Sequence, residues 1–362
     1  MVFCNAKVCQ AIGVNTNPYK YKALDGLRGL CAGLVVFHHL YWRDGSGIGF
    51  WSVDQLNGLE KVISLFIGQL PVAIFFIISG FLFYFIASNN KPVLPFLRGR
   101  ILRIYPPVIF SLLLAFLAVY FVSDYNLNCS VGVFKYIPTP FGFLSGGTVC
   151  GLKMGVINSG VLWTLVWEWR LYIFVPILMI VLKLFKNQTA VVSVLAVFIL
   201  MLWKTQLLDI MDASCLMLFV SGFYCAILSK KEMDRVKQSY CFILGLALFL
   251  VVLALTKRVY HPLIALSLIP VFLSVVNGFS VFGFLTSNKM QLLGVTSFTI
   301  YLNHGVFQFI SKTYLYGYKL YLWQIVSVIG ISLTAPFLYK YIEISFQAKK
   351  INRSAASITP SV

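Results

Sequence analysis

The sequence predicts an all-α, polytopic membrane protein with about ten transmembrane helices. Hydrophobic residues make up 59% of its 362 residues and charged residues only 11%. The mean hydropathy is +0.86, which is far from the composition of a soluble globular domain. The apolar runs are long, recur throughout the chain and lack the alternation of barrel strands, so helices are favoured over a β-barrel. We therefore expect most of the chain to lie in a lipid bilayer.

Ten stretches are long enough, or nearly long enough, to cross about 30 Å of hydrocarbon. The stretch at 189–205 is the shortest. For the two stretches that flank 257–260, a tight helical hairpin is the alternative to two separate spans. The ten predicted stretches lie near 24–42, 64–87, 101–123, 162–184, 189–205, 212–229, 240–256, 261–281, 293–311 and 320–341.

Charge placement predicts the orientation of these helices. Lys and Arg gather before the first stretch, after the second, fourth and sixth, and after the tenth, so the positive-inside rule predicts that both termini are cytoplasmic. The net charge of +18 is scattered over short loops, which argues against nucleic-acid binding. The expected organisation is a cytoplasmic tail at 1–20, a transmembrane domain at 21–345 with a large external loop at about 124–160, and a cytoplasmic tail at 346–362.

Two of the eight cysteines fall in the predicted external loop. Cys129 and Cys150 would therefore face an oxidising compartment, where a disulfide between them is a possibility that their spacing alone leaves open. The other six lack metal-ligand spacing, and so do the four histidines. We expect no metal site, Cys4 and Cys9 in the tail, and small apolar roles for Cys31, Cys215, Cys225 and Cys241.

The first stretch carries several ionisable residues. Arg28 and His39 are eleven residues apart, so a helix places both on one face about 16 Å apart, whereas His38 points about 80° away. Asp25 is close enough to pair with Arg28 along the helix. Arg28 alone also fits a snorkelling cation, and a lone histidine near a helix end is more often interfacial than catalytic. Their register nevertheless indicates function, because ionisable groups inside a membrane are costly.

Polar residues in later stretches extend this set. Ser79 precedes Gly80, a pair that is most simply explained by close helix packing. Arg100 and Arg103 share a helix face, where paired guanidinium groups suit phosphate, although ordinary positive-inside topology also explains them.

The fourth and ninth stretches also carry polar residues. Glu168 enters the fourth apolar stretch and needs a partner there, while Trp163, Trp167 and Trp169 fit an interfacial belt. Asn303 and His304 lie in the predicted outer half of the ninth stretch.

Taken in order, these residues resemble the acyltransferase-3 family of membrane-bound O-acyltransferases. The resemblance runs from residue 22 to about 345. The motifs that carry it are Leu24-Asp-Gly-Leu-Arg-Gly-Leu30 with His39, Phe75-Phe-Ile-Ile-Ser-Gly-Phe81, Arg100-Ile-Leu-Arg-Ile-Tyr-Pro106, Leu162-Trp-Thr-Leu through Glu168 and Tyr172, Tyr301-Leu-Asn-His304, and Tyr341-Ile-Glu343.

The resemblance implies transfer of an acyl group, usually acetyl, from cytoplasmic acyl-CoA to a hydroxyl of a cell-surface or lipid-linked glycan, such as O-antigen lipopolysaccharide, capsule or exopolysaccharide, by a protein of the bacterial inner membrane. It implies that Arg28, Arg100, Arg103 and Ser79 bind acetyl-CoA. His39 would be a general base or an acyl-accepting nucleophile, and Glu168 would orient it. Supporting or substrate-binding roles fall to Asp25, His38, Asn303, His304 and Trp163.

A transporter or flippase of a glycan or acylated small molecule is the alternative function. Ten helices, a basic inner face and buried His, Arg and Glu side chains fit that class too. Related halves, which many transporters have, are not visible in the sequence. The oligomeric state is not predicted.

Overall fold

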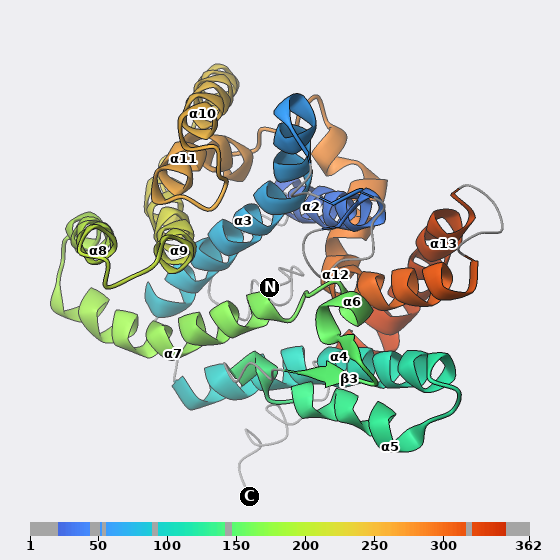
Figure 1. The fold of residues 1–362 in the computed structure, drawn as a ribbon. Coiled ribbons are helices and arrows are strands. Elements are labelled where there is room, and N and C mark those ends of the chain that lie inside the picture. Colours follow the sequence, from blue (N-terminus) through green and yellow to red (C-terminus); the bar gives the residue numbers. More distant parts are fainter. Residues whose placement is uncertain are drawn as a thin grey trace, which may run out of the picture. The chain divides into compact units, whose positions relative to one another are not determined.

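Long helices dominate the computed structural model of this chain (Figure 1). The structure describes residues 21–43, 51–52, 56–88, 93–141, 147–315 and 321–344. The long helices are α2 (Lys22–Tyr41), α3 (Gly58–Ser88), α4 (Val93–Val122), α7 (Trp163–Leu184), α8 (Gln188–Lys204), α9 (Ile210–Leu228), α10 (Arg235–Thr256), α11 (Pro262–Val276), α12 (Asn288–Leu315) and α13 (Leu322–Leu338).

The predicted all-α class is confirmed, and each of the ten predicted stretches overlaps one of these helices. Among the described residues, six helices are long and apolar enough to cross a membrane: α3, α4, α7, α9, α10 and the segment Leu322–Glu343. Helices α8 and α11 are apolar but shorter. The full count of ten spans and the cytoplasmic position of the termini stay predictions, and the tails at 1–20 and 346–362 lie outside the described residues.

Short elements join the long helices. The connection between α4 and α7 holds most of them, and the π-helical turn η5 continues α13. The short elements are β1 (Trp42–Arg43), β2 (Trp51–Ser52), α5 (Leu127–Ser130), η2 (Val131–Tyr136), η3 (Thr139–Phe141), β3 (Thr148–Val149), β4 (Leu152–Lys153), α6 (Met154–Asn158), η4 (Phe284–Thr286) and η5 (Tyr339–Ile344). Strand β1 pairs in parallel with β2, and β3 pairs antiparallel with β4.

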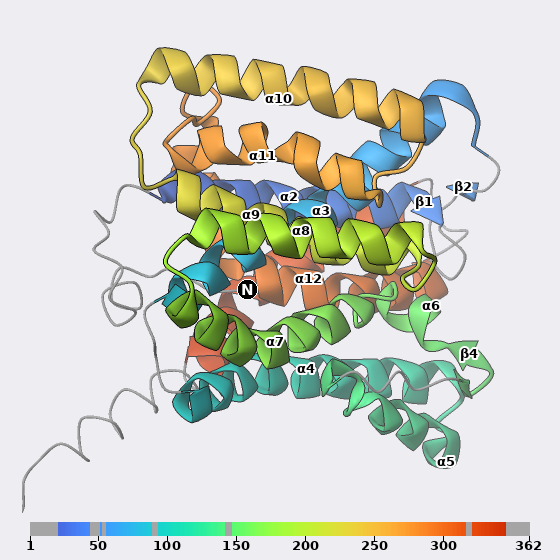
Figure 2. The ribbon, with the colours of Figure 1, turned by 90° about the vertical axis from the view of Figure 1, so that its left-hand side faces the viewer.

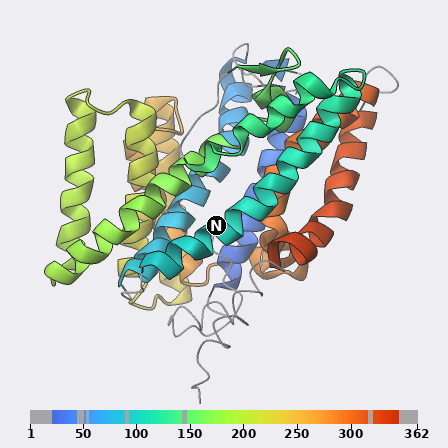
Figure 3. The same ribbon diagram turned by 90° about the horizontal axis from the view of Figure 1, so that it is seen from below.

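The described residues form two compact units, the first drawn from residues 21–35, 57–88 and 171–295. In this unit α9 packs against α3, α8 and α11, and α10 lies along α11 (Figures 2 and 3). Glycines permit the contact of α3 with α9. A Cβ at Gly80 would overlap the carbonyl oxygen of Phe219, and one at Gly222 would overlap that of Ile77. The Ser79-Gly80 pair therefore lies at a close helix contact, as its packing interpretation predicts.

Glycines also explain the spacing of the motif around Asp25. A Cβ at Gly26 would overlap the carbonyl oxygen of Leu285, and a Cβ at Gly29 would lie 2.7 Å from the backbone nitrogen of Gly294. Gly294 in turn meets the backbone of Asp25. The start of α2 thus lies directly against η4 and the first turns of α12, with no room for side chains at these positions.

Helix starts in the first unit follow the capping residues in the sequence. Asn187 accepts a hydrogen bond from the backbone N–H of Ala190, and Asp209 and Asp234 make the same contact at the starts of α9 and α10. His261 caps α11 through Nδ1, which accepts from the N–H of Leu263 at 3.2 Å. His261 therefore has a structural role at the start of α11.

The second unit is drawn from the described residues of 36–56, 93–170 and 296–344. Helix α4 packs against α5, η2, α6 and η5, and the Ser111 hydroxyl donates to the carbonyl of Leu302 in α12 at 3.0 Å. Two consecutive prolines usually interrupt a helix, but α4 continues through Pro106 and Pro107. Since α4 begins at Val93, Arg100 and Arg103 lie within the helix rather than at its start.

A disulfide joins Cys129 and Cys150 in the connection between α4 and α7, with Cα atoms 5.2 Å apart. Nearby, Lys135 Nζ donates to the carbonyl of Thr148 at 3.1 Å, and the Tyr136 hydroxyl donates to that of Gly147 at 3.1 Å. These bonds hold η2 beside β3. Of the remaining described cysteines, Cys31, Cys215 and Cys225 are buried thiols and Cys241 is half-buried.

Removing this disulfide is expected to destabilise the protein. The bond closes a loop between residues 21 apart, and loop-closure entropy predicts a loss of about 3 kcal/mol. We expect Cys129→Ser and the double variant Cys129→Ser/Cys150→Ser to lower the unfolding temperature equally in detergent. Cys241→Ser serves as the control. If reductant lowers the wild-type unfolding temperature no more than that of the double variant, the bond contributes nothing.

Candidate functional site

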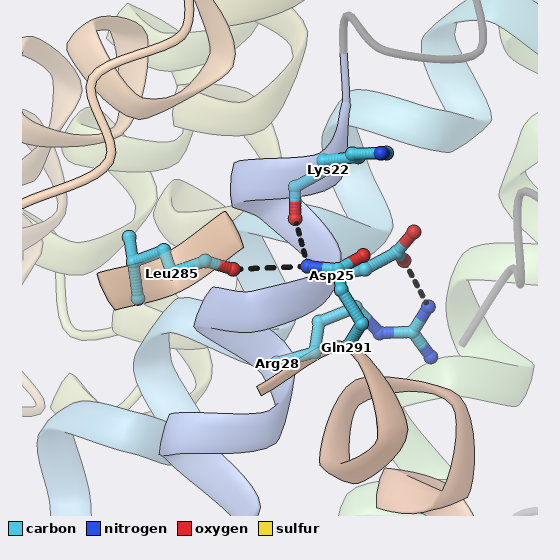
Figure 4. Close-up of polar contacts among 5 residues, drawn as sticks. All are labelled: Lys22, Asp25, Arg28, Leu285 and Gln291. Carbon is cyan, nitrogen blue, oxygen red and sulfur yellow. Dashed lines mark hydrogen bonds and ion pairs between the residues drawn. The ribbon is translucent and has the colours of Figure 1, made fainter. Parts of the chain in front are cut away.

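Arg28 is almost fully buried, with 1% of its side chain exposed, and pairs with Asp25 (Figure 4). The distance from Nη1 of Arg28 to Oδ1 of Asp25 is 3.5 Å, as their three-residue spacing predicts. The Gln291 amide holds the same part of α2, because its Nε2 donates to the carbonyls of Lys22 at 2.7 Å and Leu285 at 2.9 Å. The buried Arg28 guanidinium therefore lies on α2, whose first turn is held by a hydrogen bond from α12.

His39 lies near the end of α2 and stacks on His304 of α12. The ring centroids are 5.3 Å apart and the ring planes are inclined by 27°. His38 instead stacks on Trp42, with centroids 5.8 Å apart. Both histidines of α2 are buried, so burial does not distinguish them; their neighbours do. His38 meets His39 edge to face, with centroids 5.1 Å apart, and His39 is the one of the two that stacks on His304.

Helix α7 contacts α12 in this region through Thr164 of α7 and Tyr301 of α12. The hydroxyls of Thr164 and Tyr301 are 3.1 Å apart, and the rings of Tyr301 and His304 have centroids 6.1 Å apart. Glu168 lies one turn after Thr164 on the same face of α7 and is 7% exposed. These contacts therefore connect the helix of Glu168 with His304 and, through the stacked rings, with His39.

Two of the three tryptophans of α7 are packed inside the protein instead of facing lipid as an interfacial belt does. Trp167 and Trp169 are buried, and Trp163 is half-buried. The Arg170 guanidinium lies over the Trp167 ring at 4.4 Å from its centroid. Trp169 contacts Phe141 of η3 at 4.8 Å between centroids, and Phe141 contacts Tyr105 of α4 at 4.7 Å. The belt interpretation is wrong for Trp167 and Trp169, because protein surrounds these rings.

A second polar group lies along α12, and two of its members, Glu343 and Thr299, were absent from the predicted site. Glu343 of η5 is 1% exposed, and its carboxylate accepts a hydrogen bond from the Thr299 hydroxyl at 3.2 Å. Asn303 Nδ2 donates to the Thr299 carbonyl at 2.9 Å. An acidic residue in an apolar terminal helix was the available signal for Glu343, whereas Thr299 and Tyr301 gave none, because their partners are distant in the sequence.

The two arginines of α4 differ in exposure. Arg103 is buried, whereas Arg100 is half-buried and lies with Cζ 5.3 Å from the centroid of the Phe96 ring. In its own unit, Ser79 is buried on α3 beside the glycine contact with α9. A buried guanidinium on an apolar helix is consistent with a role beyond setting topology.

The second unit contains most of the predicted site. It includes His38, His39, Arg100, Arg103, Trp163, Glu168, Asn303 and His304, while Asp25, Arg28 and Ser79 belong to the first unit. Across the described residues, no group of three or more His, Cys, Asp or Glu side chains is arranged to hold a metal ion. The polar side chains that the second unit contributes to the predicted site carry imidazole, carboxylate, amide, indole and guanidinium groups.

Helical spans and buried ionisable side chains define an integral membrane protein with a polar centre inside a helical unit. The acyltransferase-3 family model, described as an acyltransferase domain, matches residues 21–341. The chain therefore belongs to this family of acyltransferases, which confirms the resemblance in the sequence. No curated protein and no solved structure matches the chain.

Proposed function

We propose that this protein transfers an acyl group, acetyl above all, from cytoplasmic acyl-CoA to a hydroxyl of a cell-surface or lipid-linked glycan. The observation that carries the proposal is the buried His39 imidazole, stacked on His304 in a chain of the acyltransferase family. An imidazole can act as a base on a hydroxyl or accept the acyl group itself. O-antigen, capsule and exopolysaccharide are the acceptors we propose, with the protein in the bacterial inner membrane.

The donor would be held through its phosphates. Arg100 and Arg103 lie one turn apart on α4, and a guanidinium fork matches phosphate oxygens. Arg28 is proposed to serve the same donor from α2, where its pairing with Asp25 fixes the side chain. Burial strengthens these charge interactions, because water screens them less there. Ser79, which lies beside the close contact of α3 with α9, is also proposed to bind the donor.

Glu168 is proposed to support the histidines. Glu168 lies one turn after Thr164, which contacts Tyr301 of α12. This position supports a role for the Glu168 carboxylate beside the histidine site on α12. A carboxylate near an imidazole stabilises the protonated ring that forms when a hydroxyl loses its proton. His38, Trp163 and Asn303 are proposed to shape the acceptor-binding region around these groups.

The test measures donor consumption and glycan acylation together. Cells expressing the chain are expected to gain O-acetyl signals in surface polysaccharide relative to cells with empty vector. Purified protein in nanodiscs should release CoA from [14C]acetyl-CoA when glycan-bearing membranes are added. Movement of a labelled glycan lipid across the membrane without release of CoA would contradict acyl transfer and identify a flippase.

A further inference from the structure

The hydrogen bonds of His304 define which of its ring nitrogens carries a proton. Nδ1 lies 2.9 Å from the carbonyl oxygen of Tyr301 and 3.3 Å from that of Ile300. Carbonyl oxygens only accept hydrogen bonds, so Nδ1 must be the donor. In the neutral ring the lone pair is therefore on Nε2. The α12 backbone thus sets the tautomer of this imidazole.

That lone pair is buried and lacks a hydrogen bond. His304 is 0% exposed, and Nε2 has no hydrogen-bond partner among the described residues. Buried polar atoms are nearly always satisfied, so each exception calls for an explanation. Nε2 can be satisfied by a group that donates a hydrogen, such as a hydroxyl.

Local packing fixes this nitrogen beside His39. Gln308 Nε2 donates to the carbonyl of Val36 at 3.2 Å, which joins α12 to α2 one turn before His39. Gly305 has no room for a side chain, because a Cβ would overlap the backbone of Asn158. The two stacked rings are consequently held in place, and a charge on one disfavours a charge on the other.

We propose that His304 is the base that takes the proton of the acceptor hydroxyl, while His39 carries the acyl group. This inference rests on the proposed acyl-transfer function and divides its chemistry between two imidazoles. A hydroxyl that donates to Nε2 of His304 lies beside the ring of His39, so its oxygen is next to an acyl group bound there.

The reaction proceeds in two steps. A ring nitrogen of His39 attacks the thioester carbon, the C–S bond breaks, and the thiolate takes the proton from the other His39 nitrogen to give CoA thiol. The acceptor oxygen then attacks the acyl carbon while its proton passes to Nε2 of His304. The C–N bond breaks with its electron pair returning to the His39 ring, which recovers a proton from His304. An ester is released and both rings are again neutral.

The experiment separates the two half-reactions in the full-length protein. Rapid quench of purified protein with [14C]acetyl-CoA alone reports acyl transfer to the protein, and O-acetyl content of surface polysaccharide in cells reports the second step. We expect His304→Gln to acquire the label at the wild-type rate and to lose polysaccharide acetylation by more than about 100-fold. His39→Ala should lose both.

Two further variants exclude a folding defect. Ser297→Ala removes another buried polar atom of α12 that has no hydrogen-bond partner in the described part of the chain, and it should retain both half-reactions. Added imidazole should restore acetylation by membranes that contain His304→Ala, because a diffusible base can fill the space of the lost ring.

Each outcome distinguishes the inference from the function on which it rests. If wild-type protein neither consumes acetyl-CoA nor acetylates polysaccharide, the proposed function fails. If wild-type protein acetylates polysaccharide but never acquires label from donor alone, the acyl-histidine division is overturned. The division is also overturned if His304→Gln still acetylates polysaccharide. If His304→Gln no longer acquires label from the donor, His304 is assigned to donor binding instead.

Discussion

Replacing His39 with alanine is expected to lower acylation of surface polysaccharide by at least about 100-fold, the usual contribution of a general base or nucleophile. The reason is that His39 stacks on His304, a second buried imidazole of the same unit. His38→Ala should lose much less activity, since His38 stacks on Trp42 instead. The measurement is O-acetyl content at matched protein level in the membrane.

The comparison of adjacent histidines controls for damage to the helix. Both side chains are buried, so truncation of either creates a similar cavity in the same turn of α2. Equal losses in the two variants would assign the effect to packing. Unchanged acetylation in His39→Ala, with protein present at the normal level, would remove His39 from the mechanism.

Gly26→Ala is expected to destabilise the first unit by about 1–3 kcal/mol, because overpacking at a close contact displaces the backbone. A Cβ at Gly26 would overlap the Leu285 carbonyl. Its matched control is Gly33→Ala on the same helix, where no atom lies within 4 Å of the added carbon. Alanine there should be neutral or stabilise by up to about 1 kcal/mol, since it favours helix more than glycine does.

Thermal unfolding in detergent, followed by fluorescence, measures both glycine variants. Gly294→Ala provides a second test of the same contact, because its Cβ would meet the backbone of Asp25 from the α12 side. Unfolding temperatures that fall equally for Gly26→Ala and Gly33→Ala would show that the close contact at Gly26 does not determine the outcome.

The helices were predictable because a run of bilayer length has to satisfy its backbone polar groups internally. Each predicted stretch accordingly overlaps a helix. Their ends were less predictable. Helix α3 begins at Gly58, before the apolar run, because Glu60 and Lys61 continue the helix without contributing hydropathy. Likewise, α4 passes through Pro106-Pro107, where local propensity alone predicts a disturbance.

The candidate site was predictable where the relevant residues are near in sequence. The spacing of Asp25 and Arg28 predicts an ion pair, and the structure has it. The contacts of Thr164 with Tyr301, Thr299 with Glu343 and His39 with His304 join residues far apart in the chain. Helical periodicity says which face a residue occupies but not which helix lies opposite, so these contacts required the fold.

The disulfide between Cys129 and Cys150 can also show which side of the membrane the α4–α7 connection faces. Such bonds persist where the surroundings are oxidising and are rare in the cytosol, so the redox state of this pair in intact cells reports the side of the membrane that the α4–α7 connection faces. Thiol tagging of cells would thereby orient the entire chain without added reporters. On the predicted external placement of this connection, the bond would form only after the connection had crossed the membrane, so the time at which it forms would report when the helices on either side are inserted.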